Sequence, residues 1–536
     1  MLCEVGYRVA SLAHSSTIEY PRTGGMLTWR TICFLGLLAF LVALPLLWPG
    51  DAPFIKDEPT MFLHAAAANQ QHQLASGGVV GTVGLPYGPL SIWFYQGLLH
   101  LTCVPERWVV ARALLMVLLM TSGLLLLSWA LRLWRWFIPV VMVSPYLWFY
   151  SRHLWDNSLL LPVSVLALGC YAVFLAGRSS WALVVSVGLA LVLPCIHLMS
   201  LALAAAILGH MFLFSRAELW RSRWFIGGVV CCILGAQARY LASLVWAVAD
   251  FAPHSAGAQN EWGGWLFPLL GGRLLSGGGL DYFFGPGWLP RSLAYRLAVA
   301  ISLIAYPAVL LGIVFAARQV WQKRGEFLPP KAGAQRSASP DARLHVSAIC
   351  LVALALQIPV CGLSSTFFHP HYHNGLWIAS VMFAWLAVDA AVKKWWGMVL
   401  VAADATALVV VLLTSILLVH QRGGTRGIRY GPTIADQHKI AIALGTESRE
   451  DISCTVSNFL RFPSLRALRA LAVPDNSGRL PGPLVIEFGS DDPRSGRVRV
   501  RSVAPWQQTN EGHGQETSGG TALAPTRLGA AASGTN

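Results

Sequence analysis

Charged residues are scarce in this chain of 536 residues. Asp, Glu, Lys and Arg together make up 12% of it, whereas hydrophobic residues make up 55%, and the mean hydropathy is +0.55. An ordinary soluble domain has about twice that charged fraction. This shortage excludes a soluble enzyme and a disordered protein. The apolar residues come in long runs, which predicts a polytopic membrane protein.

The sequence also lacks several patterns that would indicate other classes of protein. It has ten cysteines but no Cys-x-x-Cys pair and no zinc-ligand spacing, so neither a disulfide framework nor a zinc motif is indicated. Most cysteines lie in or beside apolar runs, as small packing residues do. No Asn-x-Ser/Thr sequon is present, which disfavours a eukaryotic luminal protein. No internal repeat of the kind that marks inverted-repeat transporters is found.

Acidic residues are fewer than basic ones, and the net charge is 39 − 25 = +14. In a soluble protein this excess would suggest binding to nucleic acid. Here most of the basic residues lie between apolar runs, so orientation in a lipid bilayer explains them better. We therefore expect the bilayer as a partner and no nucleic acid.

Apolar runs near the length of a membrane span occur eleven times between residues 27 and 420. They are Leu27–Trp48, Trp108–Leu131, Phe137–Tyr150, Ser158–Gly177, Trp181–Ile196, His197–Phe214, Phe225–Trp246, Ser292–Ala317, His345–Leu363, Gly375–Val392 and Trp395–His420. The predicted fold is an all-α polytopic membrane protein with about 11 transmembrane helices.

The distribution of basic residues predicts the orientation of these spans. With residues 1–26 in the cytoplasm, the inner segments hold 17 of the 39 basic residues, and the outer loops and spans before the C-terminal region hold 8. This agrees with the positive-inside rule. We expect a multi-pass protein of a bacterial inner (plasma) membrane with its C-terminal region outside.

The chain becomes polar after the last span. Two helices, Ile434–Leu444 and Pro463–Leu471, and three alternating segments, Ile452–Ser457, Leu484–Phe488 and Val498–Val503, predict a small α/β region over residues 421–504. Residues 505–536 are rich in Gly, Ser, Thr and Ala, which is typical of a disordered tail.

The first outer loop, residues 49–107, is too long and too patterned for a simple connector. Asp57 and Glu58 follow the first span directly, and helices are predicted over Met61–Ala75 and Leu90–Leu101. These helices are too short or too amphipathic to span, so we expect them to lie at the membrane surface. The acidic pair is either a reaction site, with a partly desolvated carboxylate as general base, or a cap on the first helix.

Three stretches of this sequence resemble the membrane glycosyltransferases of the protein-mannosyltransferase type (glycosyltransferase family 39, GT-C fold). The first is Asp57-Glu58 with the later Gly88-Pro89-Leu90-Ser91-Ile92-Trp93. The second is Ser144-Pro145-Tyr146-Leu147-Trp148 with Ser151-Arg152-His153-Leu154-Trp155-Asp156-Asn157. The third is Pro194–Leu201, which is similar to a broken helix with a His near its outer end. Together they cover residues 27–215 and, more weakly, 364–392.

The resemblance implies transfer of a sugar from a polyprenyl-phosphate donor to a protein, lipid or glycan acceptor on the outer face, with inversion. It makes Asp57 the base and Glu58 a residue that orients the acceptor or supports Asp57. It also makes Arg152 the main candidate for the phosphate, with His153 second. Arginine suits bidentate phosphate binding, although Arg152 could equally snorkel to lipid headgroups or pair with Asp156.

Two stretches depart from the family pattern. Tyr87-Gly88 stands where a basic residue often precedes the Pro-Pro-Leu helix, and His369-Pro370-His371-Tyr372-His373-Asn374 replaces an Arg-Tyr-x-x-x-x-Pro stretch. We therefore expect Tyr87, His371, Tyr372 and His373 among the substrate-binding residues, with contacts to a lipid phosphate or a sugar; the alternative is that the histidine stretch is an interfacial surface segment. Alternating histidines could hold zinc, but a two-residue spacing is not a recognised ligand spacing here, so no cofactor is indicated.

Two rival functions fit the same composition. A transporter or flippase for a lipid-linked saccharide would need a polar site at mid-membrane, and a non-catalytic assembly subunit would keep the fold without the activity. Asp389 and Asp404 lie within the last two predicted spans. Acids inside a membrane are functional by default. However, Asp389 has Lys393 one helical turn later, and Asp404 has no evident role, so we assign neither to the site.

Overall fold

The computed structural model describes most of the chain between Trp29 and Ser502. The described residues are 29–55, 57–81, 85–134, 136–177, 179–249, 267–276, 280, 284, 288–290, 292–327, 341–363, 370–425, 430–445, 452–454, 463–473, 478–480, 484–488 and 495–502. The cytoplasmic segment predicted over residues 1–26, the tail predicted over 505–536, and His369 lie outside these residues.

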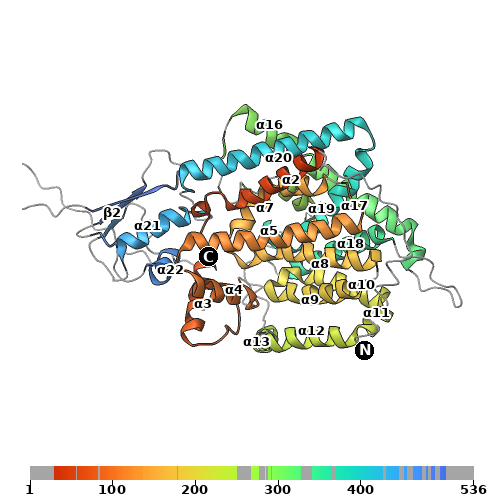
Figure 1. The fold of residues 1–536 in the computed structure, drawn as a ribbon, viewed down its shortest axis with the longest axis horizontal. Helices are drawn as coiled ribbons and strands as arrows, with labels where there is room; N and C mark the ends of the chain where they lie inside the picture. Colours follow the sequence, from red (N-terminus) through yellow and green to blue (C-terminus); the bar gives the residue numbers. More distant parts are fainter. Residues whose placement is uncertain are drawn as a thin grey trace, which may run out of the picture.

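Long helices make up the body of the protein, and several run along the longest axis of the molecule (Figure 1). They are α2 (Trp29–Ala43), α5 (Pro105–Ala130), α8 (Leu160–Gly177), α9 (Ser180–Ile196), α10 (Leu201–Phe214), α12 (Arg223–Ala236), α13 (Ala238–Ala249), α16 (Leu293–Ser302), α17 (Ala305–Gln322), α18 (Ala342–Leu363), α19 (Trp377–Ala391) and α20 (Trp395–Arg422).

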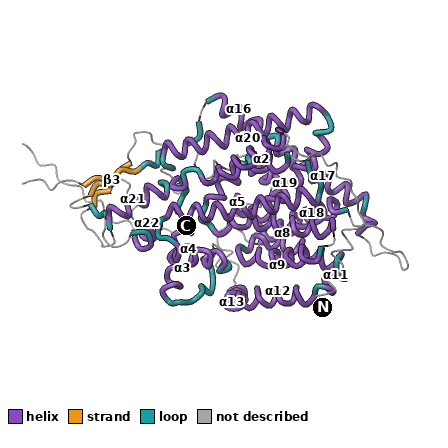
Figure 2. Tube along the Cα trace, in the orientation of Figure 1, coloured by secondary structure: helices purple, strands orange, loops and turns teal. Residues whose placement is uncertain are grey.

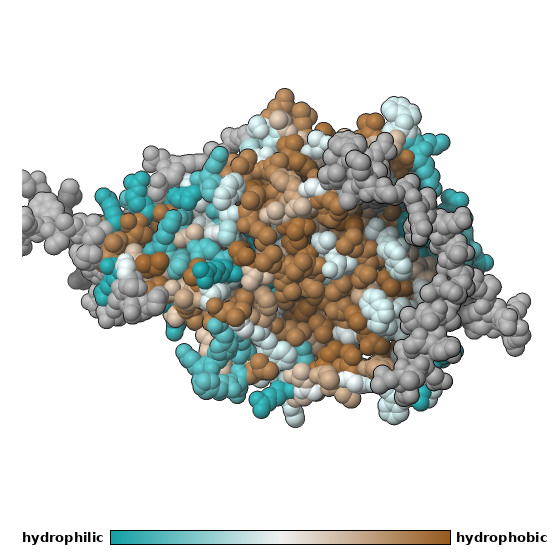
Figure 3. Space-filling model, in the orientation of Figure 1, coloured by the Kyte–Doolittle hydropathy of each residue, from teal (hydrophilic) through white to brown (hydrophobic). Residues whose placement is uncertain are grey.

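Among the described residues, six helices are long and apolar enough to cross a membrane, or seven if the bent pair α12–α13 is one span. They are Pro105–Ala130, Asp156–Gly177, Leu293–Gln322, Ala342–Val360, His371–Ala391 and Trp395–Arg422. Figure 3 shows a broad hydrophobic belt across the middle of one face, with hydrophilic residues toward its ends. The chain is therefore an all-α membrane protein in its main body.

The other predicted spans correspond to shorter or broken helices. Phe34–Leu46, Ser180–Ile196 and Leu198–Phe214 are apolar but have at most 17 residues. The predicted span Phe137–Tyr150 is divided into α6 (Phe137–Met142) and α7 (Pro145–Arg152). The division falls where Ser144 caps α7 through Leu147 N and Pro145 occupies its first turn. The count of eleven spans stays a prediction.

Close approach of backbones holds α5 against α8. A Cβ atom on Gly123 would lie 2.7 Å from Leu166 N, and one on Gly169 would lie 2.7 Å from Gly123 O. Small residues at such crossings let membrane helices pack tightly, because lipid supplies no hydrophobic drive between them.

A larger side chain at the α5–α8 crossing should therefore destabilise the fold. We expect Gly123→Val to cost about 1–3 kcal/mol, the usual cost of overpacking, measured as earlier thermal unfolding in detergent. Gly209→Val in α10 is the matched control, since a Cβ there meets nothing within 4 Å. Equal loss of stability in both variants would contradict this view of the crossing.

Short helices and turns gather around the bundle. They are η1 (Leu44–Leu46), η2 (Pro49–Asp51), α3 (Asp57–Gln70), α4 (Leu90–Leu101), η3 (Asp156–Leu159), η4 (Leu198–Ser200), α11 (Arg216–Arg221), α14 (Phe267–Leu275), η7 (Arg324–Phe327) and η8 (Pro370–Leu376). The helix expected over Met61–Ala75 begins four residues earlier, at Asp57, whereas Leu90–Leu101 has the expected bounds.

The helices α3 and α4 pack on each other and on α5 through aromatic rings. The ring of Phe62 stacks on Tyr95 at 4.4 Å and lies 4.6 Å from the ring of Trp108. Asn69, near the end of α3, and Gln96, in the middle of α4, are joined by reciprocal hydrogen bonds of 3.0 and 3.1 Å. This packing holds α3 and α4 against α5. The amphipathic sequences of the two helices predicted only that they lie at the membrane surface.

The strands lie at one end of the molecule (Figure 2). Strand β2 (Leu484–Phe488) lies between β1 (Ile452–Cys454), to which it is parallel, and β3 (Val498–Ser502), to which it is antiparallel. The registers pair Ile452 with Leu484 and Phe488 with Val498. Helix α21 (Ile434–Leu444) packs against β3 and against α22 (Pro463–Leu471). We call the end of the bundle that carries these elements the capped end.

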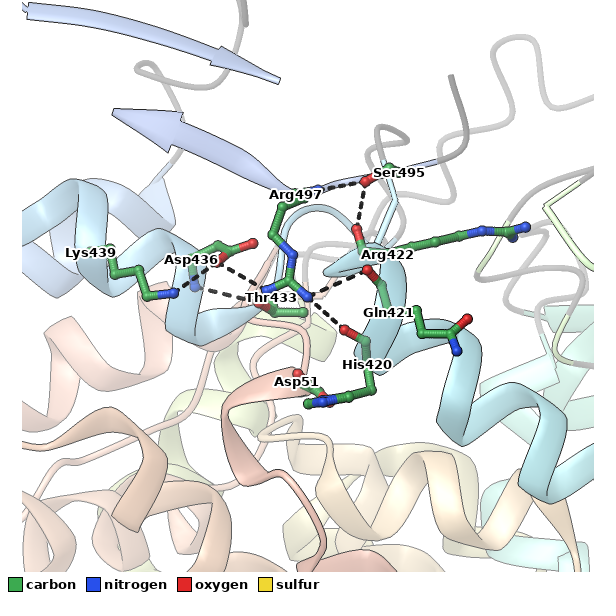
Figure 4. A network of polar contacts seen from close by, with 9 residues as sticks. All are labelled: Asp51, His420, Gln421, Arg422, Thr433, Asp436, Lys439, Ser495 and Arg497. Carbon is green, nitrogen blue, oxygen red and sulfur yellow. Dashed lines mark hydrogen bonds and ion pairs between the residues drawn. The ribbon is translucent and has the colours of Figure 1, made fainter. Parts of the chain in front are cut away.

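Polar contacts fasten these elements to the end of α20 (Figure 4). Arg497 donates from Nη2 to the His420 carbonyl at 2.6 Å, and its Nη1 lies 3.7 Å from Asp436 Oδ1. Nδ1 of His420 lies 2.9 Å from Asp51 Oδ2. The helix ends at Gly423, whose φ of 63° is in the left-handed region. The first loop, the last long helix and the C-terminal strands therefore meet at the capped end.

Candidate functional site

Asp57 lies in the first turn of α3, where the helix dipole favours an acidic side chain. It is half-buried, and the indole Nε1 of Trp155 lies 3.1 Å from its Oδ2, in position to donate a hydrogen bond. Trp155 follows α7, so this bond joins the first loop to a segment about a hundred residues later. The carboxylate is held in one orientation but is not sealed from its surroundings.

Glu58 differs from its neighbour because it is completely buried. Its Oε2 accepts a 2.7 Å hydrogen bond from the backbone N–H of Ile55, and its Oε1 lies against Nδ1 of His153. Both oxygens are therefore engaged by the protein. The contact between Glu58 and His153 joins the start of α3 to the end of α7. Through this contact the two side chains position the turn that carries Asp57.

Contacts between rings continue from Trp155 into three further segments of the chain. The ring of His371 lies 4.5 Å from Trp155 and 4.3 Å from Tyr372. His197, at the break between α9 and η4, lies 6.5 Å from the Tyr372 ring and stacks on Tyr87 at 4.2 Å. We call this run of rings, from Trp155 through His371, Tyr372 and His197 to Tyr87, the aromatic ladder.

Tyr87 reaches the ladder from a short hairpin. Its N–H donates to Val79 O at 3.0 Å, and its carbonyl accepts from Gly78 N at 2.8 Å. The next residue must be glycine, because a Cβ on Gly88 would lie 1.4 Å from the carbonyl oxygen of Cys195. Burial raises the pKa of the Tyr87 phenol, and the nearby charges of Asp156 and, to a smaller extent, Asp57 raise it further. Tyr87 therefore remains a neutral hydrogen-bonding group.

The histidine-rich segment forms η8, and its members face different neighbours. His371 and Tyr372 belong to the aromatic ladder, whereas Nε2 of His373 lies 2.7 Å from Ser380 Oγ in α19. Asn374 donates from Nδ2 to Asn157 O at 3.1 Å and accepts from the Tyr146 hydroxyl at 2.5 Å. These bonds tie the segment to α7 and to the residues that follow it.

Arg152 faces away from Asp57. It is buried, with 2% of its surface exposed, so it does not snorkel to lipid headgroups. Its Nη2 donates to the carbonyl of Trp48, and its guanidinium lies 5.0 Å from the Trp148 ring. Burial lowers the pKa of this guanidinium. These contacts direct Arg152 toward the first-loop turns rather than toward the aromatic ladder or Asp156.

Arg112 is a residue that the sequence analysis did not single out. It is completely buried in α5, and its Nη2 donates 2.8 Å hydrogen bonds to Trp155 O and Ser158 Oγ. Its guanidinium lies 5.6 Å from the Phe94 ring and 6.0 Å from the Tyr95 ring. The signal was present, because an arginine inside an apolar run is rarely without a function. Arg112 holds the turn that carries Trp155, and so supports Asp57 indirectly.

The described residues contain no group of three His, Cys, Asp or Glu side chains placed to hold a metal ion. Comparisons of the chain with protein-family models, with curated proteins and with solved structures found no match. The function must therefore be argued from the arrangement itself. A half-buried carboxylate beside a row of aromatic and imidazole rings can accept a proton from a hydroxyl and can bind a ring-shaped polar molecule.

Proposed function

We propose that this protein is a membrane glycosyltransferase that moves a sugar from a polyprenyl-phosphate donor to an acceptor hydroxyl at the capped end. The single observation that carries the proposal is the placement of Asp57. An acid at the start of a loop helix is oriented by Trp155 and lies next to the aromatic ladder, above a hydrophobic body suited to a bilayer. A lipid-linked sugar donor requires both a polar reaction site and a hydrophobic body in the bilayer, whereas a soluble sugar donor requires only the reaction site.

In the proposed reaction Asp57 acts as general base. The acceptor oxygen attacks the anomeric carbon of the sugar, its proton passes to Asp57, and the bond from that carbon to the phosphate oxygen breaks. The polyprenyl phosphate leaves with the electron pair, and the anomeric configuration inverts. No covalent sugar–enzyme intermediate is needed, so no nucleophilic Ser or Cys is required.

The other residues serve the proposed reaction in distinct ways. The faces of Tyr87, Tyr372 and the ladder imidazoles suit the apolar face of a sugar ring, and their polar atoms suit its hydroxyls. His371, which contacts Trp155 beside Asp57, is the residue that we assign to the leaving phosphate, because Arg152 donates to the Trp48 carbonyl instead. Glu58 and His153 fix the position of α3.

The direct test is an assay of the purified full-length chain against a panel of polyprenyl-phosphate sugars, with lipid, peptide and glycan acceptors. We expect release of polyprenyl phosphate and a glycosylated product with one sugar–acceptor pair. Asp57→Asn serves as the inactive control. Movement of an intact lipid-linked sugar across vesicles, without bond cleavage, would instead establish the flippase, and inactivity of the wild-type chain across the panel would favour the assembly subunit.

The proposal also requires the capped end to face outward, away from the cytoplasm. Reporter fusions after Arg336 and after Gly424 should report opposite sides of the membrane, with the second outside. The basic helix α11 lies at the opposite end from the strands, as the positive-inside rule requires for this orientation (Figure 1). If both fusions report one side, the proposed placement of the reaction is wrong.

A further inference from the structure

A cavity of about 370 Å³ lies between α6, α17, α19 and α20, apart from the aromatic ladder. Its walls are almost entirely apolar and include Phe137, Val381, Ala308 and Leu400. A volume of this size is typical of a site for a small molecule, and it exceeds the gaps left by imperfect packing of a core.

Asp404 lines this cavity and is the only acid among its lining residues. It is the tenth residue of α20, so it lies about 14 Å along the helix from Trp395, well within the apolar span. Its Oδ1 is buried, and none of the residues that the structure describes donates a hydrogen bond to it. A carboxyl group in such a place is costly unless a donor or a cation meets it.

A second polar atom in the wall also lacks a partner within the described part of the chain. Trp385 is 4% exposed, lines the same cavity, and has a buried indole Nε1–H with no acceptor. Its ring lies 4.9 Å from that of Phe137, so aromatic surface forms part of the wall of the cavity that Asp404 also lines. Aromatic walls together with a carboxylate are the features by which proteins bind ammonium groups.

From these observations we propose that the cavity is a binding site for a lipophilic amine, a single-chain amphiphile with a protonated amino group. The ammonium pairs with Asp404, and the chain lies along the apolar walls. This inference does not depend on the proposed sugar transfer, because it involves different residues and a different part of the bundle.

The binding test uses the full-length protein in phosphatidylcholine nanodiscs, with dodecylamine as the probe. We expect saturable binding at least about tenfold tighter than that of dodecanol, which has the same chain without the charge, because hydrogen bonds between charged groups are stronger than those between neutral groups. Asp404→Asn should weaken dodecylamine binding by about tenfold or more and leave dodecanol binding unchanged.

Two further variants distinguish the contribution of the Asp404 carboxyl group to binding from that of the cavity. Asp389→Asn is the matched control, since Asp389 lies near the end of α19 and pairs with Arg343 at 3.3 Å, outside the cavity wall. It should bind dodecylamine as the wild type does. Ala308→Phe fills the cavity while keeping Asp404, and it should abolish binding even if Asp404→Asn fails to fold.

A chemical readout on the wild-type protein completes the test. Dicyclohexylcarbodiimide modifies carboxyl groups within apolar surroundings, and dodecylamine should slow its reaction with Asp404 but not with Asp389. The proposal is overturned if dodecanol protects Asp404 and binds as well as the amine, since the cavity would then hold acyl chains only. Unchanged amine binding in Asp404→Asn, or in a folded Ala308→Phe, would overturn it equally.

Discussion

Asp57→Asn should fold and insert normally, bind the lipid donor nearly as well as the wild type, and transfer sugar at least about a hundred times more slowly. The reason is that asparagine keeps an oxygen for the Trp155 indole and an acceptor for the start of α3, but it cannot take a proton. A base acts on the transition state, so turnover falls while donor affinity does not. The measurement is single-turnover transfer alongside donor binding to the same preparation.

Glu58→Gln is the informative comparison, because Glu58 is fully buried whereas Asp57, the residue before it, is only half-buried. Glu58 is fully buried and engaged by Ile55 and His153, so this change should lower the free energy of unfolding by about 1–3 kcal/mol. Turnover per folded molecule should change far less than in Asp57→Asn. A fully active Asp57→Asn enzyme would make Asp57 a helix cap and remove the proposed mechanism.

Apolar runs predicted the elements of the bundle well because hydrophobicity is a property of each segment alone. The predicted helix Leu90–Leu101 and the predicted strand Leu484–Phe488 have the bounds of α4 and β2. The apolar run Phe137–Tyr150 did not predict the break inside it. That break is at Ser144-Pro145, a pair that commonly begins a helix. Whether a short helix such as α9 crosses the membrane depends on its neighbours, which a local pattern does not contain.

The candidate site was harder to predict because side-chain direction is a tertiary property. Trp155 contacts both Asp57 and His371, and the ring contacts continue from His371 to Tyr372 and, through His197, to Tyr87. The assignment of these residues to a substrate site stays a prediction. Arg152 occupies the expected segment, but its contacts to Trp48 and Trp148 direct it elsewhere. A motif fixes which residue is present near a site, whereas packing decides what that residue faces.

Arg112→Met should lower turnover by about tenfold or more while leaving the fold intact. The change removes the two hydrogen bonds that hold Trp155 O and Ser158 Oγ, and bonds to charged groups are worth about 1.5–3 kcal/mol each. Methionine fills a similar volume between the rings of Phe94 and Tyr95, which limits the loss of packing, but two buried acceptors lose their donor, so the thermal unfolding midpoint should fall as well. The measurements are turnover and the thermal unfolding midpoint.

The matched control is Arg107→Met, five residues earlier on α5, where the arginine is exposed and its loss should change neither quantity. A double variant then tests how Arg112 acts. If Arg112 works by holding Trp155 on Asp57, its loss should matter little once Asp57→Asn has removed the base, because residues that act as a unit are not additive. An equal further loss in the Asp57→Asn background would show that Arg112 acts on the substrate or on stability through a separate route.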